Sequence, residues 1–238
     1  MIRLLTTLTI LLVVSFPALA QNQGTVNISI YGDSLGDGLW SGLTTILKKN
    51  PNCKVNRHSK IGAGLTRADY LNWIEELPKQ IESEKPKLAL LLFGANDQQG
   101  LRDDKKGHAF KSQSWREAYA LRMGSIIKEL KNNGTIPFWI SLPIMAENEA
   151  NQNAIFLNEL FLEKARKENI AFLAIANDFV DKEGKFTTHM NDAKGRSQQI
   201  RKSDGIHFTG YGYELLANKI WKEVETILHN QGIDGLCQ

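Results

Sequence analysis

The sequence has few cysteines, little net charge and no repeated segment. Its 238 residues include only Cys53 and Cys237, so one disulfide at most can form within the chain. Lys and Arg together number 29 and Asp and Glu number 26, which gives a formal net charge of +3. Because these charges are mixed along the chain, nucleic acid is not expected as a partner. With no repeat, low-complexity tract or long linker, the mature chain is expected to form one domain.

The first twenty residues resemble a secretory leader. They place a cation at Arg3 before an apolar run from Leu4 to Phe16, and they close on a small-x-small pattern. The run is shorter than the ~20 apolar residues of a spanning helix, although an uncleaved anchor is the alternative. We therefore predict a signal peptide over residues 1–20 and a mature domain over residues 21–238. The mature protein is expected to be periplasmic or secreted, with no stable membrane insertion after signal removal.

Export to an oxidising compartment favours a disulfide between the two cysteines. A bond between Cys53 and Cys237 would tie the C-terminal tail to the region of the second predicted strand. Two unpaired thiols are the alternative, because sequence alone does not show that the sulfur atoms meet.

Short apolar runs alternate with helical patterns along the mature chain. Strands are expected over five runs, Thr25–Tyr31, Cys53–Ser59, Leu88–Gly94, Ile136–Leu142 and Ile170–Ala176. Strands separated by helices predict right-handed crossovers and a mostly parallel sheet that is covered on both faces, which is an α/β fold. The third run is apolar without alternation, as expected for a central strand that is buried on both sides.

Two long polar segments, residues 98–114 and 181–203, interrupt this pattern. Segments of this length in a compact domain are usually either functional lids or disordered. Both follow predicted strands on the side where open α/β sheets bind ligands, so we expect them to lie near a site.

Ser34, in the stretch IYGDSLGDGL, lies where the first predicted strand gives way to the first helix. Its hydroxyl would lie at the carboxyl edge of the sheet, beside backbone N–H groups and the positive end of a helix dipole, which stabilise an oxyanion. The alternative is a serine that only caps the helix, since Ser commonly precedes a first helical turn. A nucleophilic serine needs a base, and the base needs an orienting group.

Asp204 and His207 supply such a pair just before the last predicted helix, in SDGIHFTG. Their spacing lets the carboxylate reach one imidazole nitrogen while the other stays free. Asp204, His207 and His189 could also ligate a metal, but no tight ligand spacing favours a preformed metal site. The remaining histidines lack such a neighbour or lie within a strand, and are expected to be structural or at the surface: His58, His108, His189 and His229.

Donors for an oxyanion are expected at two further strand ends. Asn96, in LFGANDQQG after the third strand, has a side-chain amide that donates without changing charge. Gly62 or Gly64, in SKIGAGLTR after the second strand, can bring a backbone N–H close to a reacting carbonyl because no Cβ intervenes. Each feature alone is a common turn, but all lie on one side of the predicted sheet, and separate turns do not explain this joint placement.

In these blocks the chain resembles the SGNH (GDSL-type) hydrolases. The four blocks of that family are matched in family order by GDSL with Ser34, GAGLTR with Gly64, GAND with Asn96, and DGIH with Asp204 and His207. The resemblance spans nearly the whole mature chain. It implies a three-layer, flavodoxin-like α/β/α fold with five parallel strands, and a hydrolase that uses no metal and no other cofactor.

The resemblance also implies a role for each residue. Ser34 would attack an ester carbonyl, His207 would take the serine proton and pass it to the leaving alcohol, and Asp204 would orient His207. The backbone N–H groups of Ser34 and Gly64, together with the Asn96 side chain, would form the oxyanion hole. Water would then hydrolyse the acyl-serine.

The segments GANDQQ, GLTRADYLNW and DGIHFT are similar to those of an exported, cell-envelope branch of the bacterial family. Some members of that branch are O-acetylesterases on envelope polysaccharides. We therefore expect a glycan ester, such as O-acetylated peptidoglycan, as the substrate. The alternatives are a lysophospholipase or thioesterase, an O-acyltransferase and, from another class, a catalytically silent glycan-binding protein. Three tryptophans could stack on sugar rings or could pack within the protein, Trp40, Trp73 and Trp115.

Overall fold

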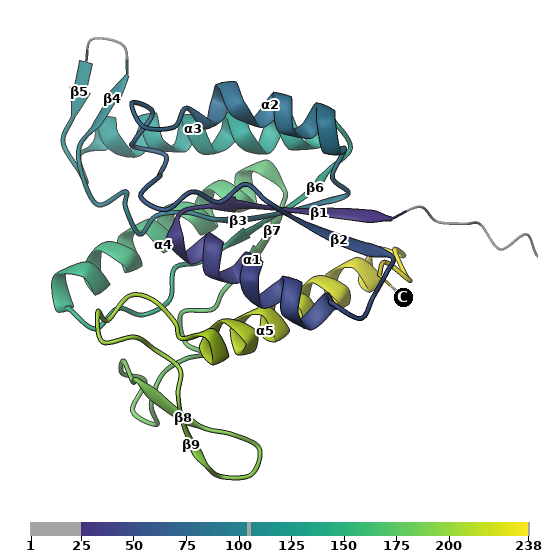
Figure 1. The fold of residues 1–238 in the computed structure, drawn as a ribbon. Coiled ribbons are helices and arrows are strands. Elements are labelled where there is room, and N and C mark those ends of the chain that lie inside the picture. Colours follow the sequence, from purple (N-terminus) through teal and green to yellow (C-terminus); the bar gives the residue numbers. More distant parts are fainter. Residues whose placement is uncertain (1–24, 104–105, 238) are drawn as a thin grey trace, which may run out of the picture.

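The computed structural model describes residues 25–103 and 106–237. Its main sheet has five parallel strands in the order β2-β1-β3-β6-β7 (Figure 1). The strands are β1 (Val26–Gly32), β2 (Cys53–Arg57), β3 (Leu88–Leu92), β6 (Ile136–Ile140) and β7 (Ala171–Leu173). Each strand falls largely within the range expected from the apolar runs.

Helices cover both faces of this sheet, and α1 packs against α5 on one face while α2, α3 and α4 cover the other (Figure 1). The helices are α1 (Ser34–Leu47), α2 (Trp73–Glu84), α3 (Gln113–Asn132), α4 (Asn148–Glu168) and α5 (Gly210–Asn230). The predicted three-layer α/β fold is therefore confirmed.

The centre of the sheet is apolar on both faces. All five residues of β3 are buried, and Leu90 pairs with Ile30 on one side and with Phe138 on the other. Strand β3 therefore contributes to the core on both faces of the sheet, which explains why it shows no alternation of polar and apolar residues.

The three tryptophans pack within the protein. Trp115 is fully buried and Trp73 nearly so, and both contact other aromatic rings. The ring N–H of Trp40 donates to the backbone carbonyl of Val55, and the guanidinium of Arg57 lies over the same ring. The packing interpretation of these residues therefore holds, and none of them forms an open sugar platform.

Each of the two long polar segments contains a short antiparallel hairpin. The first holds β4 (Leu101–Asp103) and β5 (Lys106–His108), and the second holds β8 (His189–Asn191) and β9 (Ser197–Gln199). Both segments follow the carboxyl end of a sheet strand, and the hairpins project on opposite sides of the molecule (Figure 1).

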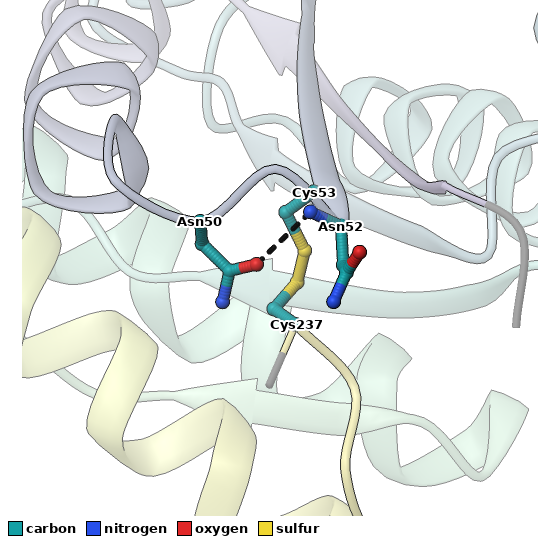
Figure 2. Close-up of a disulfide and its surroundings, with 4 residues drawn as sticks. All are labelled: Asn50, Asn52, Cys53 and Cys237. Carbon is teal, nitrogen blue, oxygen red and sulfur yellow. Dashed lines mark hydrogen bonds between the residues drawn. A yellow bond between two sulfur atoms is a disulfide. The ribbon is translucent and has the colours of Figure 1, made fainter. Parts of the chain in front are cut away.

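Cys53 and Cys237 form a disulfide, as predicted from the expected export of the chain. Their Cα atoms lie 5.2 Å apart, and 184 positions separate them in the sequence. Figure 2 shows the bond at the start of β2, next to the turn in which the Asn50 side chain accepts a hydrogen bond from the backbone N–H of Asn52. The bond fastens the segment that follows α5 to the edge strand of the sheet.

The predicted signal peptide, residues 1–20, lies outside the described residues. Within the part of the chain that the structure describes, no helix has both the length and the apolar character needed to cross a membrane.

Candidate active site

Ser34 is the first residue of α1 and directly follows β1. The helix is capped by Asp33, whose Oδ1 atom accepts a hydrogen bond from the backbone N–H of Leu35 at 2.9 Å. Gly32 makes this turn possible, because a Cβ at this position would lie 2.1 Å from the carbonyl oxygen of Leu92. Since Asp33 is the capping residue, the interpretation of Ser34 as only a helix cap is wrong, and its hydroxyl is free for another partner.

That partner is His207. The Nε2 atom of His207 lies 2.7 Å from the Oγ atom of Ser34, and its Nδ1 atom lies 2.9 Å from the Oδ2 atom of Asp204. Because the carboxylate can only accept, Nδ1 carries the proton and Nε2 is left to accept the serine O–H. The three side chains therefore form a Ser-His-Asp arrangement in the orientation that general-base catalysis requires.

Asp204 is held as a carboxylate by the turn in which it lies. Partial burial opposes its ionisation, but its Oδ1 atom accepts backbone N–H bonds from His207 and Ile206, both at 2.9 Å, and its other oxygen meets the His207 ring. These donors lower the pKa of Asp204 to about 2. The aspartate is therefore ionised at neutral pH and can stabilise an imidazolium on His207.

The GDSL, GAGLTR and GAND blocks are hydrogen-bonded to one another at the carboxyl edge of the sheet. Asp33 accepts from the backbone N–H of Ala95 at 2.8 Å, which joins the first block to the third. The Asn96 side chain donates to the carbonyl of Ala63 at 2.9 Å, which joins the third block to the second. With the bond from His207 to Ser34, all four predicted blocks meet at one site.

Asp97 organises this site, although the sequence analysis gave it no role. It is fully buried, and its carboxylate accepts from the backbone N–H groups of Leu65 and Thr66, from the Thr66 hydroxyl and from the Tyr119 hydroxyl, at 2.7 to 3.1 Å. Four donors on one carboxylate fix the second block relative to the third. In sequence, the signal was a lone carboxylate directly after Asn96, which is also typical of an exposed turn.

Gly64 lies against this carboxylate, and only glycine fits there. A Cβ on Gly64 would lie 2.2 Å from the Oδ1 atom of Asp97. Helix α3 also holds the second block in place, because the Arg122 guanidinium donates a hydrogen bond to the carbonyl of Leu65. The close approach explains why position 64 is glycine, and the oxyanion role of Gly64 and Asn96 stays a prediction.

Comparison with known protein families places this geometry in context. Residues 27–223 match the model of a family described as a protein of unknown function (DUF459). The chain belongs to that family. No curated protein sequence shows a significant match to this DUF459 member.

Several solved structures have a fold similar to that of this chain. A putative acylhydrolase from Bacteroides fragilis superposes with a TM-score of 0.59 at 18% identity, over 85% of this chain and 88% of that one. A GDSL-like lipase from Bacteroides thetaiotaomicron gives a TM-score of 0.60 at 18% identity, over 85% and 89%. A mutant of an acetyl-xylooligosaccharide esterase from Geobacillus gives 0.58 at 14% identity, over 84% and 95%. The DUF459 member therefore has the fold of SGNH hydrolases, as the four blocks predicted.

Arg201 is a second residue that the sequence analysis missed. Its side chain is fully buried, and its Nη2 atom donates to the carbonyls of Ile144 and Ile206 at 3.0 and 2.9 Å. The guanidinium also stacks over the Phe208 ring at 4.3 Å. Burial lowers the pKa of Arg201 to about 10, so it stays cationic at neutral pH. It holds the turn that carries His207 against the loop after β6.

Asp33 has the opposite environment to Asp204. It is fully buried, and desolvation raises its pKa from 3.8 to about 7, helped by the negative charge of Asp97 and opposed by backbone N–H bonds from Leu35, Ala95 and Gly94. A helix cap next to the predicted nucleophile therefore changes its charge near neutral pH.

The expectation that His108 and His229 lack acidic partners is wrong, and His58, expected within a strand, contacts the Glu84 carboxylate at 2.7 Å. His108 lies 2.9 Å from Asp103 because the β4–β5 hairpin folds these residues onto neighbouring strands, and His229 lies 2.6 Å from Asp234 in the turn after α5. The hydrogen bonds of His108 and His229 go to Asp103 and Asp234, whereas His207 contacts Ser34, so His207 remains the base candidate. Across residues 25–103 and 106–237, no cluster of three or more His, Cys, Asp or Glu side chains is arranged to hold a metal ion.

Proposed function

We propose that the chain is an exported serine esterase that removes O-acetyl groups from an envelope glycan such as peptidoglycan. The observation that carries the chemistry is the hydrogen-bonded series from the Ser34 hydroxyl through the His207 ring to the Asp204 carboxylate. The SGNH-type fold and its hydrolase neighbours support the coarser assignment to serine hydrolases.

The geometry supports a two-step reaction. His207 Nε2 accepts the proton of Ser34 Oγ as the oxygen attacks the acetyl carbonyl, and the ionised Asp204 stabilises the resulting imidazolium. The N–H groups of Ser34 and Gly64 and the Asn96 amide are proposed to bind the oxyanion. His207 then protonates the sugar oxygen as the ester C–O bond breaks, so that the sugar leaves as an alcohol, and a water molecule activated by the same imidazole releases acetate from the acetyl-serine.

Three features support an exposed glycan as substrate and an extracytoplasmic location. The His207 side chain keeps 29% of its surface exposed and Ser34 is only partly buried, so a group on a bulky polymer can reach them. One structural neighbour is named as an acetyl-xylooligosaccharide esterase. The disulfide between Cys53 and Cys237 fits an oxidising compartment.

Hydrolysis of p-nitrophenyl esters of increasing chain length tests the proposal, with the Ser34→Ala variant beside the wild type. Ser41→Ala is the matched control, because Ser41 is an exposed serine on the same helix. We expect activity on the acetate ester that falls with chain length, is lost in Ser34→Ala and is kept in Ser41→Ala. Release of acetate from O-acetylated peptidoglycan then tests the natural substrate.

Other outcomes separate the alternatives. A preference for long acyl chains would favour a lysophospholipase or thioesterase, and acetyl transfer to an added sugar in place of acetate release would favour a transferase. Equal inactivity of the wild type and Ser34→Ala, with glycan binding retained, would favour a silent binding protein.

A further inference from the structure

The segment 181–203, called here the basic arm, contains the positive surplus of the chain. It holds six Lys or Arg residues and three Asp or Glu residues, a surplus equal to the formal net charge of +3 for all 238 residues. The rest of the sequence is therefore balanced in charge. The surplus lies in the hairpin segment that leads directly into the turn with Asp204 and His207.

Four lysines in the basic arm are exposed and have no salt bridge within the described residues, namely Lys182, Lys185, Lys194 and Lys202. The two arginines of the arm are engaged elsewhere: Arg196 pairs with Asp192 at 2.7 Å, and Arg201 is buried. The Asp181 carboxylate accepts two backbone N–H bonds within its own turn. Asp181 and Glu183 are the remaining acids, so the unpaired accessible groups of the arm, four lysines against two carboxylates, carry a net charge of +2.

Hydrogen bonds join the base of the basic arm to the turn that carries His207. The backbone N–H of Lys202 donates to the carbonyl of His207 at 2.8 Å, and the N–H of Thr209 donates to the carbonyl of Ile200 at 2.9 Å. Lys202 is itself exposed. A cation therefore lies on the residue bonded to the predicted base, and the other three lysines belong to the same segment, in the turn after β7 and in the β8–β9 turn.

We propose that the basic arm binds a polyanionic glycan and presents its O-acetyl groups to Ser34. This inference rests on the proposed esterase function and adds that the substrate polymer carries carboxylates or phosphates. A neutral acetyl ester gains nothing from four unpaired lysines, whereas a polyanion gains both steering and several simultaneous contacts.

The composition of the basic arm favours a hydrophilic polymer over a membrane surface. No large apolar side chain of the described arm is exposed, so it offers no anchor for a lipid bilayer. The exposed polar residues Asn191, Ser197 and Gln199 instead offer donors and acceptors for sugar hydroxyls.

Binding is tested without chemistry in the Ser34→Ala protein, by affinity electrophoresis through polygalacturonate. The arm variant carries Lys→Gln at 182, 185, 194 and 202, and the control carries Lys→Gln at four exposed positions at the opposite edge of the sheet, 48, 49, 54 and 87. Both variants lose four positive charges. We expect the retardation to disappear in the arm variant, to persist in the control, and to weaken at about 0.5 M salt, where the Debye length is roughly 4 Å.

Equal retardation of the two variants would overturn the proposal. So would binding to vesicles that contain phosphatidylglycerol with no binding to polygalacturonate, because that result would identify the arm as a membrane-binding surface.

Kinetics then link binding to the reaction in the protein with Ser34 intact. We expect the arm variant to lose roughly tenfold in kcat/KM on O-acetylated polygalacturonate, mainly through KM, and to hydrolyse p-nitrophenyl acetate like the wild type. On neutral O-acetylated xylan, the arm variant and the wild type should have the same kcat/KM. A tenfold loss by the arm variant on this neutral polymer as well would contradict the proposal. Failure of the esterase function would appear separately, as p-nitrophenyl acetate hydrolysis that does not depend on Ser34.

Discussion

The Nε2 atom of His207 lies 2.7 Å from the Oγ atom of Ser34, although 173 positions separate the two residues in the sequence. Ser34 is placed by the turn from β1 into α1, and His207 by the turn that precedes α5. Because α1 and α5 pack together on one face of the sheet, their N-terminal ends bring the two side chains to the same edge.

Loss of either side chain should remove nearly all activity. We expect Ser34→Ala and His207→Ala to lower kcat on p-nitrophenyl acetate by about 10⁴–10⁶, and Asp204→Asn to lower it by about 10³–10⁴ because the imidazole loses its orienting carboxylate. His229→Ala is the matched histidine control, since its carboxylate partner lies in the turn after α5. Normal turnover by His207→Ala would contradict the assignment of the base.

Asn96 is expected to act in the transition state more than in binding. Removing its amide in Asn96→Ala should lower kcat by roughly 10²–10³ with little change in KM, as for other oxyanion donors. The same amide donates to the Ala63 carbonyl, so thermal unfolding must accompany the kinetics. A change confined to the melting temperature would assign Asn96 a structural role only.

Tyr119 should act through Asp97 as a positioning residue. Tyr119→Phe removes one of the four donors to the buried carboxylate, and we expect kcat to fall about tenfold while KM is kept, because the second block loosens around Gly64. Tyr31→Phe removes an equally buried hydroxyl from a ring that packs on His58 instead. Equal kinetic effects of the two variants would indicate a general loss of packing.

Asp33 should make the protein less stable as the pH rises toward neutrality. Its pKa is 3.8 in an ordinary environment and about 7 in the fold, so between these values the folded chain binds more protons than the unfolded chain. The free energy of unfolding therefore receives from Asp33 a contribution that decreases from about pH 4 to pH 7. Asp33→Asn should flatten this slope in urea titrations, and an unchanged slope would show that another group causes it.

The disulfide should contribute substantially to stability. It closes a loop of 184 positions, so the Cys53→Ser/Cys237→Ser variant is expected to lose about 2–5 kcal/mol in the free energy of unfolding. Urea unfolding with and without dithiothreitol measures the effect. The reductant should destabilise the wild type and leave the variant unchanged.

The sequence was most informative where a pattern is local. The apolar run around Leu88–Leu92 identifies the central strand because burial on both faces removes all polar residues from it, and the change from strand to helix at Ser34 is marked by glycines and Asp33. The pair Asp204 and His207 could be recognised because three positions bring them together within one turn.

Other features depend on contacts between distant segments and leave no local pattern. Tyr119 resembles any apolar-facing residue of α3 until the fold places its hydroxyl on Asp97, 22 positions away. Arg201 lies in a polar segment where a surface cation is expected, and its burial follows from packing on Phe208 and from the carbonyl of Ile144. Such partners are set by tertiary packing and not by spacing.

The packing of α1 on α5 also bears on when the predicted site is completed during synthesis of the chain. The predicted nucleophile, Ser34, emerges from the ribosome in the first part of the chain, whereas its predicted base, His207, is made 173 residues later. On the proposed mechanism, a nascent chain that stops before His207 has a serine without its proton acceptor and does not attack esters. We therefore expect a chain truncated before α5 to lack ester hydrolysis even where its sheet has formed.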